Sequence, residues 1–510
     1  TGANNTASGY GAMYSNTTAH CNTAFGSCAL FANTTGNHNT AVGVKSLKAV
    51  TTGESNAAIG TFSGYSLTTA CGSVAVGRSA LQSTTSGSYN TAVGKSALLF
   101  NTTASRNTAV GGCSLQANTT GTDLVGVGFK SLVANTCGKL NTASGAYTML
   151  SNTTGGCNTA YGYGSLHDNT TGGNNVAVGA CAAFNNTTAI NNVAVGVKAL
   201  FQNTTATQNT GVGMFSLQNT STGGNNTGLG YGTLYSNSTG TNNIALGACS
   251  LYANTSGAGN TAVGYLSMCH NTCGNNNTAV GLYALRANTT AHANVAVGRE
   301  ALRQATTGGQ NTAVGMQAGY NMTTGYQNVA LGETALFNNT TGIRNTASGY
   351  RALFCITSGA CNVGIGYYAG YTGTTAAYNV LIGSRAAYSL TTGGQNTAVG
   401  KDSMYYLTSG THNTALGNAS LLSISTGTYN TGSGSYALYT TSTGVRNTGL
   451  GAHALYENTS GNYNVALGSQ ALRDNSTGCL NTASGTYALF ENTTGCSNTA
   501  SGYMALKNNT

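Results

Sequence analysis

Glycine recurs at every seventeenth residue of the chain, thirty times from Gly9 to Gly502, without a single insertion or deletion. A register this strict is needed only where each repeat stacks on the next, because a one-residue shift would displace every side chain of the unit. We therefore predict a solenoid: a single continuous array of 30 coils of 17 residues that spans residues 1–510. The structural turn glycines of this series include Gly9, Gly43, Gly94, Gly196, Gly298, Gly400 and Gly502.

The residues around the glycine indicate which kind of solenoid forms. We number each unit from the Asn of Asn39-Thr40-Ala41-Val42-Gly43, so that the recurring glycine occupies position five. Positions two to four favour a strand, since β-branched side chains pack well on a pleated surface. The Asn, Thr and Gly elsewhere in the unit favour turns. Seventeen residues are too few for a pair of helices, so the sequence predicts an all-β fold, a β-solenoid or β-roll. The absence of proline agrees with this, because proline cannot donate to a ladder between coils.

Composition and charge argue against several classes of function. Only 5% of the residues are charged, and the net charge of +9 forms no basic block, so we expect no nucleic-acid partner. No apolar stretch approaches the roughly 20 residues of a membrane helix, so we expect no membrane insertion. The nine acidic residues are scattered, and no catalytic motif recurs, so we expect neither an enzyme nor a cofactor. Cys269, His270 and Cys273 supply at most three ligands where a structural zinc site needs four, so we expect no metal site.

The positions of the charges indicate which side of the coil faces water. All 27 charged residues lie at positions six, seven, ten, eleven, sixteen or seventeen, and none lies in the strand. Strand residues alternate between two faces, so we expect one face to pack inside the coil. We expect the opposite face, with its small residues at positions one, three and five, to contact another chain. The alternative is that a thin coil tolerates only Ala and Gly inside. The core residues expected on the first view are Val42, Leu47, Val93, Leu98, Val195 and Leu200.

Asparagine recurs at two places in the unit. At position one it is present in 28 of 30 units, where its amide can bond from coil to coil and satisfy buried polar groups. This predicted Asn ladder includes Asn39, Asn90, Asn107 and Asn192. A second Asn opens the recurring Asn-Thr-Thr, which is an acceptor sequon for glycosylation at a predicted surface corner, although turn propensity alone would explain it. These candidate glycosylation sites include Asn33, Asn101, Asn118, Asn152, Asn169, Asn203 and Asn288.

The fourteen cysteines occupy several repeat positions, so they cannot form a disulfide in every coil. Cys479 and Cys496 share position sixteen in consecutive coils, and a coil spacing of about 4.8 Å lies within the Cα range of a disulfide. We therefore consider them the best candidates for a disulfide. The alternative is that most of the cysteines are free thiols.

Position ten carries an aromatic residue in many units, for example Tyr14, Phe31 and Tyr235. Stacked coils would align these residues in a row. Such a row either forms a partner surface, for lateral bundling or for stacking on sugars, or closes the outer edge of the coil. The sequence does not decide between the two.

The repeat resembles two groups of fibrous proteins. Asn-Thr-Ala-Val-Gly and its variants at 192–196 and 243–247 resemble the head repeats of trimeric autotransporter adhesins, and the unit around 318–325 resembles repeats of phage tail-fibre-like proteins. The resemblance implies a homotrimer or bundled filament, an extracellular, cell-surface or virion location, and a role as shaft or attachment fibre with a cell-surface or glycan receptor. We expect the chain to be a section of a longer fibre. The alternative function is a monomeric solenoid whose flat face binds ice or glycans.

Overall fold

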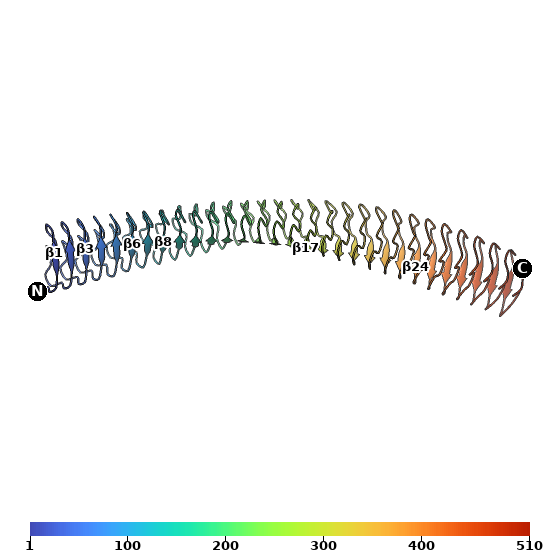
Figure 1. Cartoon of the computed structure of the whole chain (residues 1–510). Helices are drawn as coiled ribbons and strands as arrows, with labels where there is room; N and C mark the ends of the chain where they lie inside the picture. Colours follow the sequence, from blue (N-terminus) through green and yellow to red (C-terminus); the bar gives the residue numbers. More distant parts are fainter. Residues whose placement is uncertain (510) are drawn as a thin grey trace. The chain divides into compact units, whose positions relative to one another are not determined.

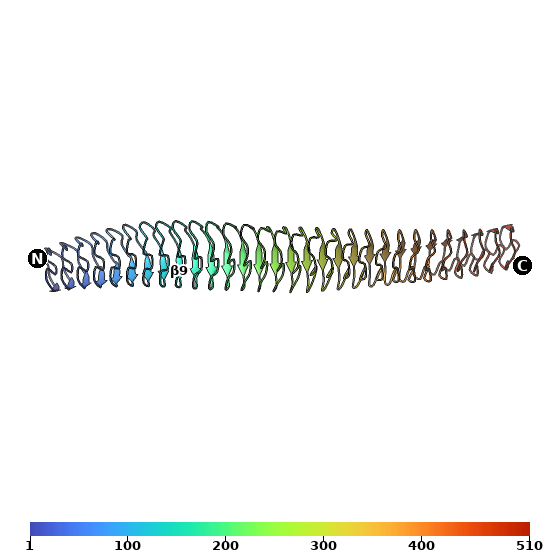
Figure 2. The same cartoon turned by 90° about the horizontal axis from the view of Figure 1, so that it is seen from above.

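The computed structural model describes residues 1–509, which form two compact units that meet in the sequence between Gly257 and Ala258. The described residues contain thirty short strands and no helix, fifteen strands in each unit. Within each unit the strands are parallel neighbours, and every coil repeats the path of the one before (Figure 1). Figure 2 shows the strands following one another along one side of the coils. Each unit is thus a parallel β-solenoid with coils of 17 residues.

Each strand covers positions two to four of its repeat. In the first unit the strands are β1 (Thr6–Ser8), β2 (Thr23–Phe25), β3 (Thr40–Val42), β4 (Ala57–Ile59), β5 (Val74–Val76), β6 (Thr91–Val93), β7 (Thr108–Val110), β8 (Val125–Val127), β9 (Thr142–Ser144), β10 (Thr159–Tyr161), β11 (Val176–Val178), β12 (Val193–Val195), β13 (Thr210–Val212), β14 (Thr227–Leu229) and β15 (Ile244–Leu246). In the second unit they are β16 (Thr261–Val263), β17 (Thr278–Val280), β18 (Val295–Val297), β19 (Thr312–Val314), β20 (Val329–Leu331), β21 (Thr346–Ser348), β22 (Val363–Ile365), β23 (Val380–Ile382), β24 (Thr397–Val399), β25 (Thr414–Leu416), β26 (Thr431–Ser433), β27 (Thr448–Leu450), β28 (Val465–Leu467), β29 (Thr482–Ser484) and β30 (Thr499–Ser501).

Backbone hydrogen bonds join each coil to its neighbours. The N–H of Thr40 donates to the carbonyl of Asn56 at 2.9 Å, one coil further on, and the N–H of Gly43 donates back to Phe25 at 2.7 Å. Equivalent bonds continue outside the strand, such as that from Leu47 to Ser63 at 2.9 Å. Most of the coil is therefore a ladder, which explains why the repeat excludes proline.

The recurring glycine turns the chain at the end of the strand. Gly43 has φ of 129°, a conformation that side-chain-bearing residues rarely adopt, and a Cβ there would lie 2.6 Å from the carbonyl oxygen of Gly60. Coils can approach this closely only without a Cβ. The same left-handed conformation occurs at Gly9, Gly94, Gly196, Gly298, Gly400 and Gly502, with φ between 124° and 136°.

The core of each coil is built from position-nine leucines and position-three alanines. Leu47, Leu98 and Leu200 are fully buried, and so is Ala41 in the strand. The prediction that the valines of position four belong to the core is wrong. Val42 is 37% exposed and Val93 36% exposed, and the side chain of Val195 is only partly buried.

The physical reason for this error is the thinness of the coil. The leucine that projects from the opposite wall fills the interior, so the facing strand position has room only for Ala or Gly. At β8, a Cβ on Gly126 would lie 3.2 Å from Cγ of Leu115. The strand therefore turns positions one and three inward and positions two and four outward. The small residues face the interior, as the alternative of a thin coil predicts, and not another chain.

Left-handed backbone conformations also occur at residues other than glycine. In the coil of Gly43 they occur at Lys45 (φ 56°), Leu47 (φ 48°) and Ser55 (φ 57°), and the same phases recur along both units. Such conformations are unfavourable for L-residues. Here the ladder offsets the strain, since the N–H groups of Lys45 and Ser55 donate to the preceding coil at 2.8 and 2.9 Å.

Candidate functional site: the outer sheet face

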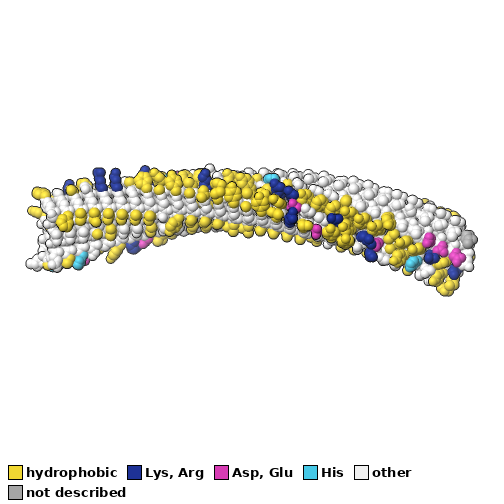
Figure 3. Space-filling model, viewed as in Figure 1, with side chains coloured by type: hydrophobic (Ala, Val, Ile, Leu, Met, Phe, Trp, Pro, Cys, Tyr) yellow, Lys and Arg dark blue, Asp and Glu magenta, His cyan; other side chains and the backbone are white. Residues whose placement is uncertain are grey.

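The outward side chains at positions two and four form a surface that we call the outer sheet face of each unit. In-register pairing places like positions side by side, as in Phe25↔Val42 and Val42↔Ile59, about 4.8 Å apart. Ile59 is 47% exposed and Phe25 44% exposed, so this surface is accessible to a ligand or another chain. Figure 3 shows hydrophobic side chains in rows that run across the coils.

The composition of the outer sheet face is uniform and free of charge. Position two is Thr in 19 coils and Val in nine, with Ala57 and Ile244 as the remaining two. Position four is Val, Leu or Ile in 22 coils and Ser in six, with Phe25 and Tyr161 as the remaining two. No Lys, Arg, Asp or Glu occurs at either position in any coil. Depletion of charge together with exposed apolar side chains is typical of the core of a protein interface.

Other outward positions of the same coils do accept charge. Position six, two residues beyond position four, carries Arg78 and Lys95, and position seven carries Lys45. Exposure to water by itself therefore does not keep charges off the coil surface. The absence of charge from the outer sheet face must have another cause.

Two rows of asparagine occupy the interior. At position one, the backbone N–H of Asn39 donates to Oδ1 of Asn22 at 2.8 Å, while its own Nδ2 donates to the carbonyl of Gly53 at 2.9 Å. The same pattern recurs at Asn107 and Asn192. At Asn90 the backbone N–H donates instead to Oγ of Ser73, which occupies position one of the preceding coil. The ladder predicted at position one is thus present, and it is formed largely by side-chain oxygens that accept backbone N–H groups.

The second row lies at position twelve and overturns the glycosylation hypothesis. Nδ2 of Asn118 donates to Oδ1 of Asn101 at 2.9 Å and to the carbonyl of Gly121 at 3.0 Å. A glycan on this nitrogen would have to leave the interior and break both bonds, so these asparagines are structural. The candidate sites that are fully buried are Asn33, Asn101, Asn118, Asn152, Asn169, Asn203 and Asn288.

The predicted disulfide is not formed. Cys479 and Cys496 are both free, and the sulfur of Cys496 accepts the backbone N–H of Cys479 at 3.1 Å. In-register stacking gives the two side chains the same orientation, whereas a disulfide needs its two Cβ atoms to converge. Most of the cysteines are free thiols, as the alternative predicts.

The aromatic row at position ten is a stack. Six consecutive rings lie face to face at centroid distances of 5.1 to 5.3 Å, with interplanar angles of 4° to 19°. These rings are Tyr320, Phe337, Phe354, Tyr371, Tyr388 and Tyr405. Within the stack each ring face is covered by its neighbour, so it is not available to a sugar. The stack closes the edge of the coils, and free ring faces exist only where it is interrupted.

A charged neighbour and burial shift the pKa values of two ionisable groups in opposite directions. The Arg106 guanidinium donates to Asp123 at 2.6 and 3.0 Å and lowers the pKa of that carboxyl to about 2. Burial raises the pKa of Tyr388 within the aromatic stack, because the phenolate is poorly solvated there. Neither group belongs to a cluster of candidate catalytic residues, and residues 1–509 hold no group of three or more His, Cys, Asp or Glu side chains placed to bind a metal.

No protein-family model matches the chain, and no curated protein matches it. Within residues 1–509 there is no helix with the length and hydropathy needed to cross a bilayer.

Proposed function

We propose that the chain is a structural shaft that associates with identical chains through the outer sheet face, as a homotrimer or a bundled filament. The observation that carries this proposal is the absence of charge from both outward strand positions in every coil. A surface that stays in water would accept an occasional Lys or Glu, as position six of the same coils does. A surface packed against another sheet would not, because an unpaired charge there loses its hydration.

The size of the outer sheet face supports the same conclusion. Fifteen strands at about 4.8 Å extend roughly 70 Å in each unit, and two outward residues per strand span about 10 Å. The resulting area of roughly 700 Å² per unit is close to the ~800 Å² that each partner buries in a standard interface. Thr and Val side chains at position two, and aliphatic side chains at position four, can interdigitate across two sheets that pack about 10 Å apart.

The interior supports a mechanical role. Backbone ladders, buried leucines and two asparagine rows tie each coil to the next, so that each coil gains most of its stability from its neighbours. The resemblance to adhesin and tail-fibre repeats agrees with an extracellular, cell-surface or virion location. We propose that the number of repeats sets the extent of the shaft.

The alternative is a monomer whose outer sheet face binds ice. It is favoured by the two-dimensional array of outward Thr and aliphatic side chains, spaced about 4.8 Å between coils and about 6.7 Å along the strand. Against it, position four changes between Val, Leu, Ile, Ser, Phe25 and Tyr161, so the array presents no constant surface to a regular lattice. A wild-type chain that is monomeric and gives thermal hysteresis would establish the alternative.

A matched pair of triple variants tests the proposal. Lys at Val178, Val195 and Val212 places three charges on the outer sheet face in consecutive coils. The control places Lys at position six of the same coils, at Ala180, Val197 and Met214. We expect the first variant to lower the molar mass of the particle, measured by light scattering, and the control to leave it unchanged. Equal masses for both variants and the wild-type chain would rule out the outer sheet face as the contact.

A further inference from the structure

The aromatic row at position ten of the second unit is interrupted between two tyrosine stacks. Tyr388 stacks on Tyr405 with a centroid distance of 5.1 Å and an interplanar angle of 4°, and Tyr439 stacks on Tyr456 at 4.9 Å and 2°. The coil between Tyr405 and Tyr439 carries Leu422 at position ten. Leucine is shorter than tyrosine and has no ring, so it does not complete the stack.

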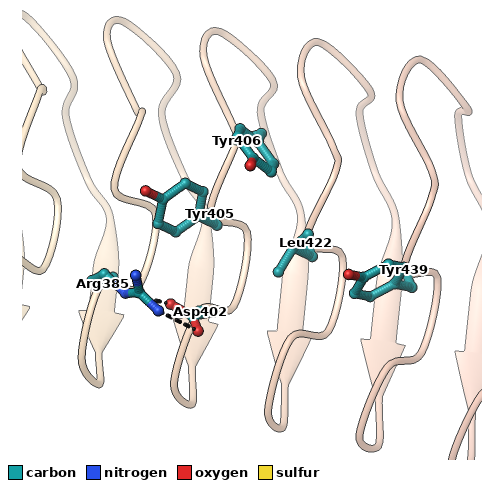
Figure 4. A pocket seen from close by; sticks show the side chains of 6 residues that line it. All are labelled: Arg385, Asp402, Tyr405, Tyr406, Leu422 and Tyr439. Carbon is teal, nitrogen blue, oxygen red and sulfur yellow. Dashed lines mark hydrogen bonds and ion pairs between the residues drawn. The ribbon is translucent and has the colours of Figure 1, made fainter.

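The interruption forms a hollow of about 270 Å³. It is lined by Arg385, Asp402, Tyr405, Tyr406, Leu422 and Tyr439. Figure 4 shows Leu422 between Tyr405 and Tyr439, with Tyr406 on one side and the Arg385–Asp402 ion pair on the other. The hollow therefore has aromatic walls, an aliphatic floor and a polar rim. This combination is typical of sites for small amphipathic ligands.

A similar gap further along the unit shows what fits between two position-ten side chains that lie two coils apart. There the guanidinium of Arg473 lies between Tyr456 and Phe490, 5.7 and 5.2 Å from their ring centroids. A flat group thus occupies the place of the missing ring. The equivalent place above Leu422 is open to a ligand from outside the chain.

The charged side chains at the rim of the hollow disfavour a cationic ligand. Arg385 lies 2.8 Å from Asp402 through Nε, and Nζ of Lys401 lies 3.8 Å from the same carboxylate. Two positive charges and one negative charge leave the rim with a net positive charge, which repels a further cation. Nη2 of Arg385 donates to Oδ2 of Asp402 at 2.9 Å, and a guanidinium has five N–H groups, so Nη1 can donate to a neutral ligand.

We propose that this hollow binds one neutral pyranose unit of a glycan. The apolar C–H face of the sugar ring packs on the tyrosine faces, and its hydroxyl groups bond to Arg385, Asp402 and the phenolic hydroxyls. A volume of about 270 Å³ lies just below the usual range for ligand pockets, which suits a single ring and not an oligosaccharide. The inference goes beyond the proposed shaft and does not depend on it, because the hollow uses positions seven, ten and eleven and leaves the outer sheet face free.

Ligand-observed saturation-transfer NMR on the full chain tests the proposal. The probes are the methyl pyranosides of glucose, galactose, mannose and N-acetylglucosamine. We expect at least one of them to show saturation of its ring C–H protons with millimolar affinity. Leu422→Tyr completes the aromatic stack and should weaken binding at least tenfold. The matched control is Leu150→Tyr, the same substitution at position ten outside the hollow, which should leave binding unchanged.

A second variant keeps the test independent of any effect of Leu422→Tyr on folding. Arg385→Gln leaves the hollow unfilled and removes the rim donor, so we expect severalfold weaker binding with an unchanged circular dichroism spectrum. Equal binding by the wild-type chain and both variants would overturn the proposal. The proposal would also be overturned if none of the pyranosides showed saturation transfer and only tetramethylammonium did so. The same holds if only p-cresol, a mimic of a protein side chain, showed it. Neither result bears on self-association, which the particle mass reports separately.

Discussion

Leu98 and Val93 lie in the same coil, but the side chain of Leu98 points inward and that of Val93 points outward. Leu98 at position nine is fully buried, between the buried Leu81 and Leu115 of the adjacent coils, whereas Val93 at position four is 36% exposed. Truncation of each side chain to alanine should therefore have very different effects. The sequence alone predicts both residues in the core.

The magnitudes follow from what each truncation removes. Leu98→Ala leaves a cavity in a packed row, and such substitutions destabilise by about 3 kcal/mol or more. Val93→Ala removes two methyl groups that are already partly in water, which costs about 1 kcal/mol or less in a single chain. On the scale of 1.4 kcal/mol per factor of ten, the local unfolding equilibrium should change by about 100-fold or more for Leu98→Ala and about fivefold or less for Val93→Ala.

The assay must be local, because stacked repeats open in segments. Hydrogen exchange followed by mass spectrometry, on peptides that cover residues 81–115, reports the opening of this coil and its two neighbours. Measurement at low protein concentration isolates the single chain. Equal loss of protection in the two variants under these conditions would refute the assignment of inner and outer positions. At high concentration the effect of Val93→Ala should grow if the outer sheet face is a contact.

Three further substitutions and one titration test the other parts of the structure. Gly43→Ala should destabilise its coil by several kcal/mol, because the added Cβ meets a backbone carbonyl and the left-handed φ is unfavourable; exchange of the adjacent peptides measures this. Asn118→Ala should lower the free energy of unfolding by about 1 to 3 kcal/mol, because it leaves buried polar groups without partners. An exposed glycosylation site would tolerate the same substitution. Asp123 has a lowered pKa, so its contribution is present above about pH 4 and lost as the pH falls towards about 2; thermal melting of wild type and Asp123→Asn should converge over that window. Tyr388 has a raised pKa, so its contribution is present below pH 10 and lost as the pH rises further; absorbance at 295 nm should show its phenolate forming later in the folded chain than in the unfolded chain.

The fold class could be predicted because the 17-residue period is a direct consequence of the stacking of equivalent coils. The recurrence of glycine at one phase, the lack of proline and the confinement of charge to six positions all follow from a ladder in which every coil is equivalent. Gly43 illustrates the link, since its close approach to Gly60 leaves no room for a Cβ. Such a constraint acts in every coil and is therefore visible in one sequence.

The sequence predicts the two faces of the strand the wrong way round, because hydrophobicity is a poor guide in a thin coil. Val42 is more apolar than Ala41, yet Ala41 is the buried residue, because Leu47 from the opposite wall leaves only enough space for a methyl group. The interior is set by volume, and the sequence shows residue types without the width of the space between the walls.

The sequence wrongly predicts that the second asparagine row lies at the surface, for a different reason. Asn118 begins Asn-Thr-Thr, which is typical of a surface turn, so local turn propensity predicts an exposed side chain. The signal that it is buried was present, since position twelve never carries a charge in any coil. The hollow at Leu422 had no such signal, because it depends on how the rings of neighbouring coils stack.

The molar mass of the wild-type particle shows whether identical chains associate. Sedimentation equilibrium over a range of concentrations gives this mass independently of particle shape. We expect a multiple of the 51.1 kDa of one chain, with three times that value for the trimer. A mass of 51.1 kDa at every concentration would contradict it and would leave the charge-free outer sheet face to be explained by a ligand surface.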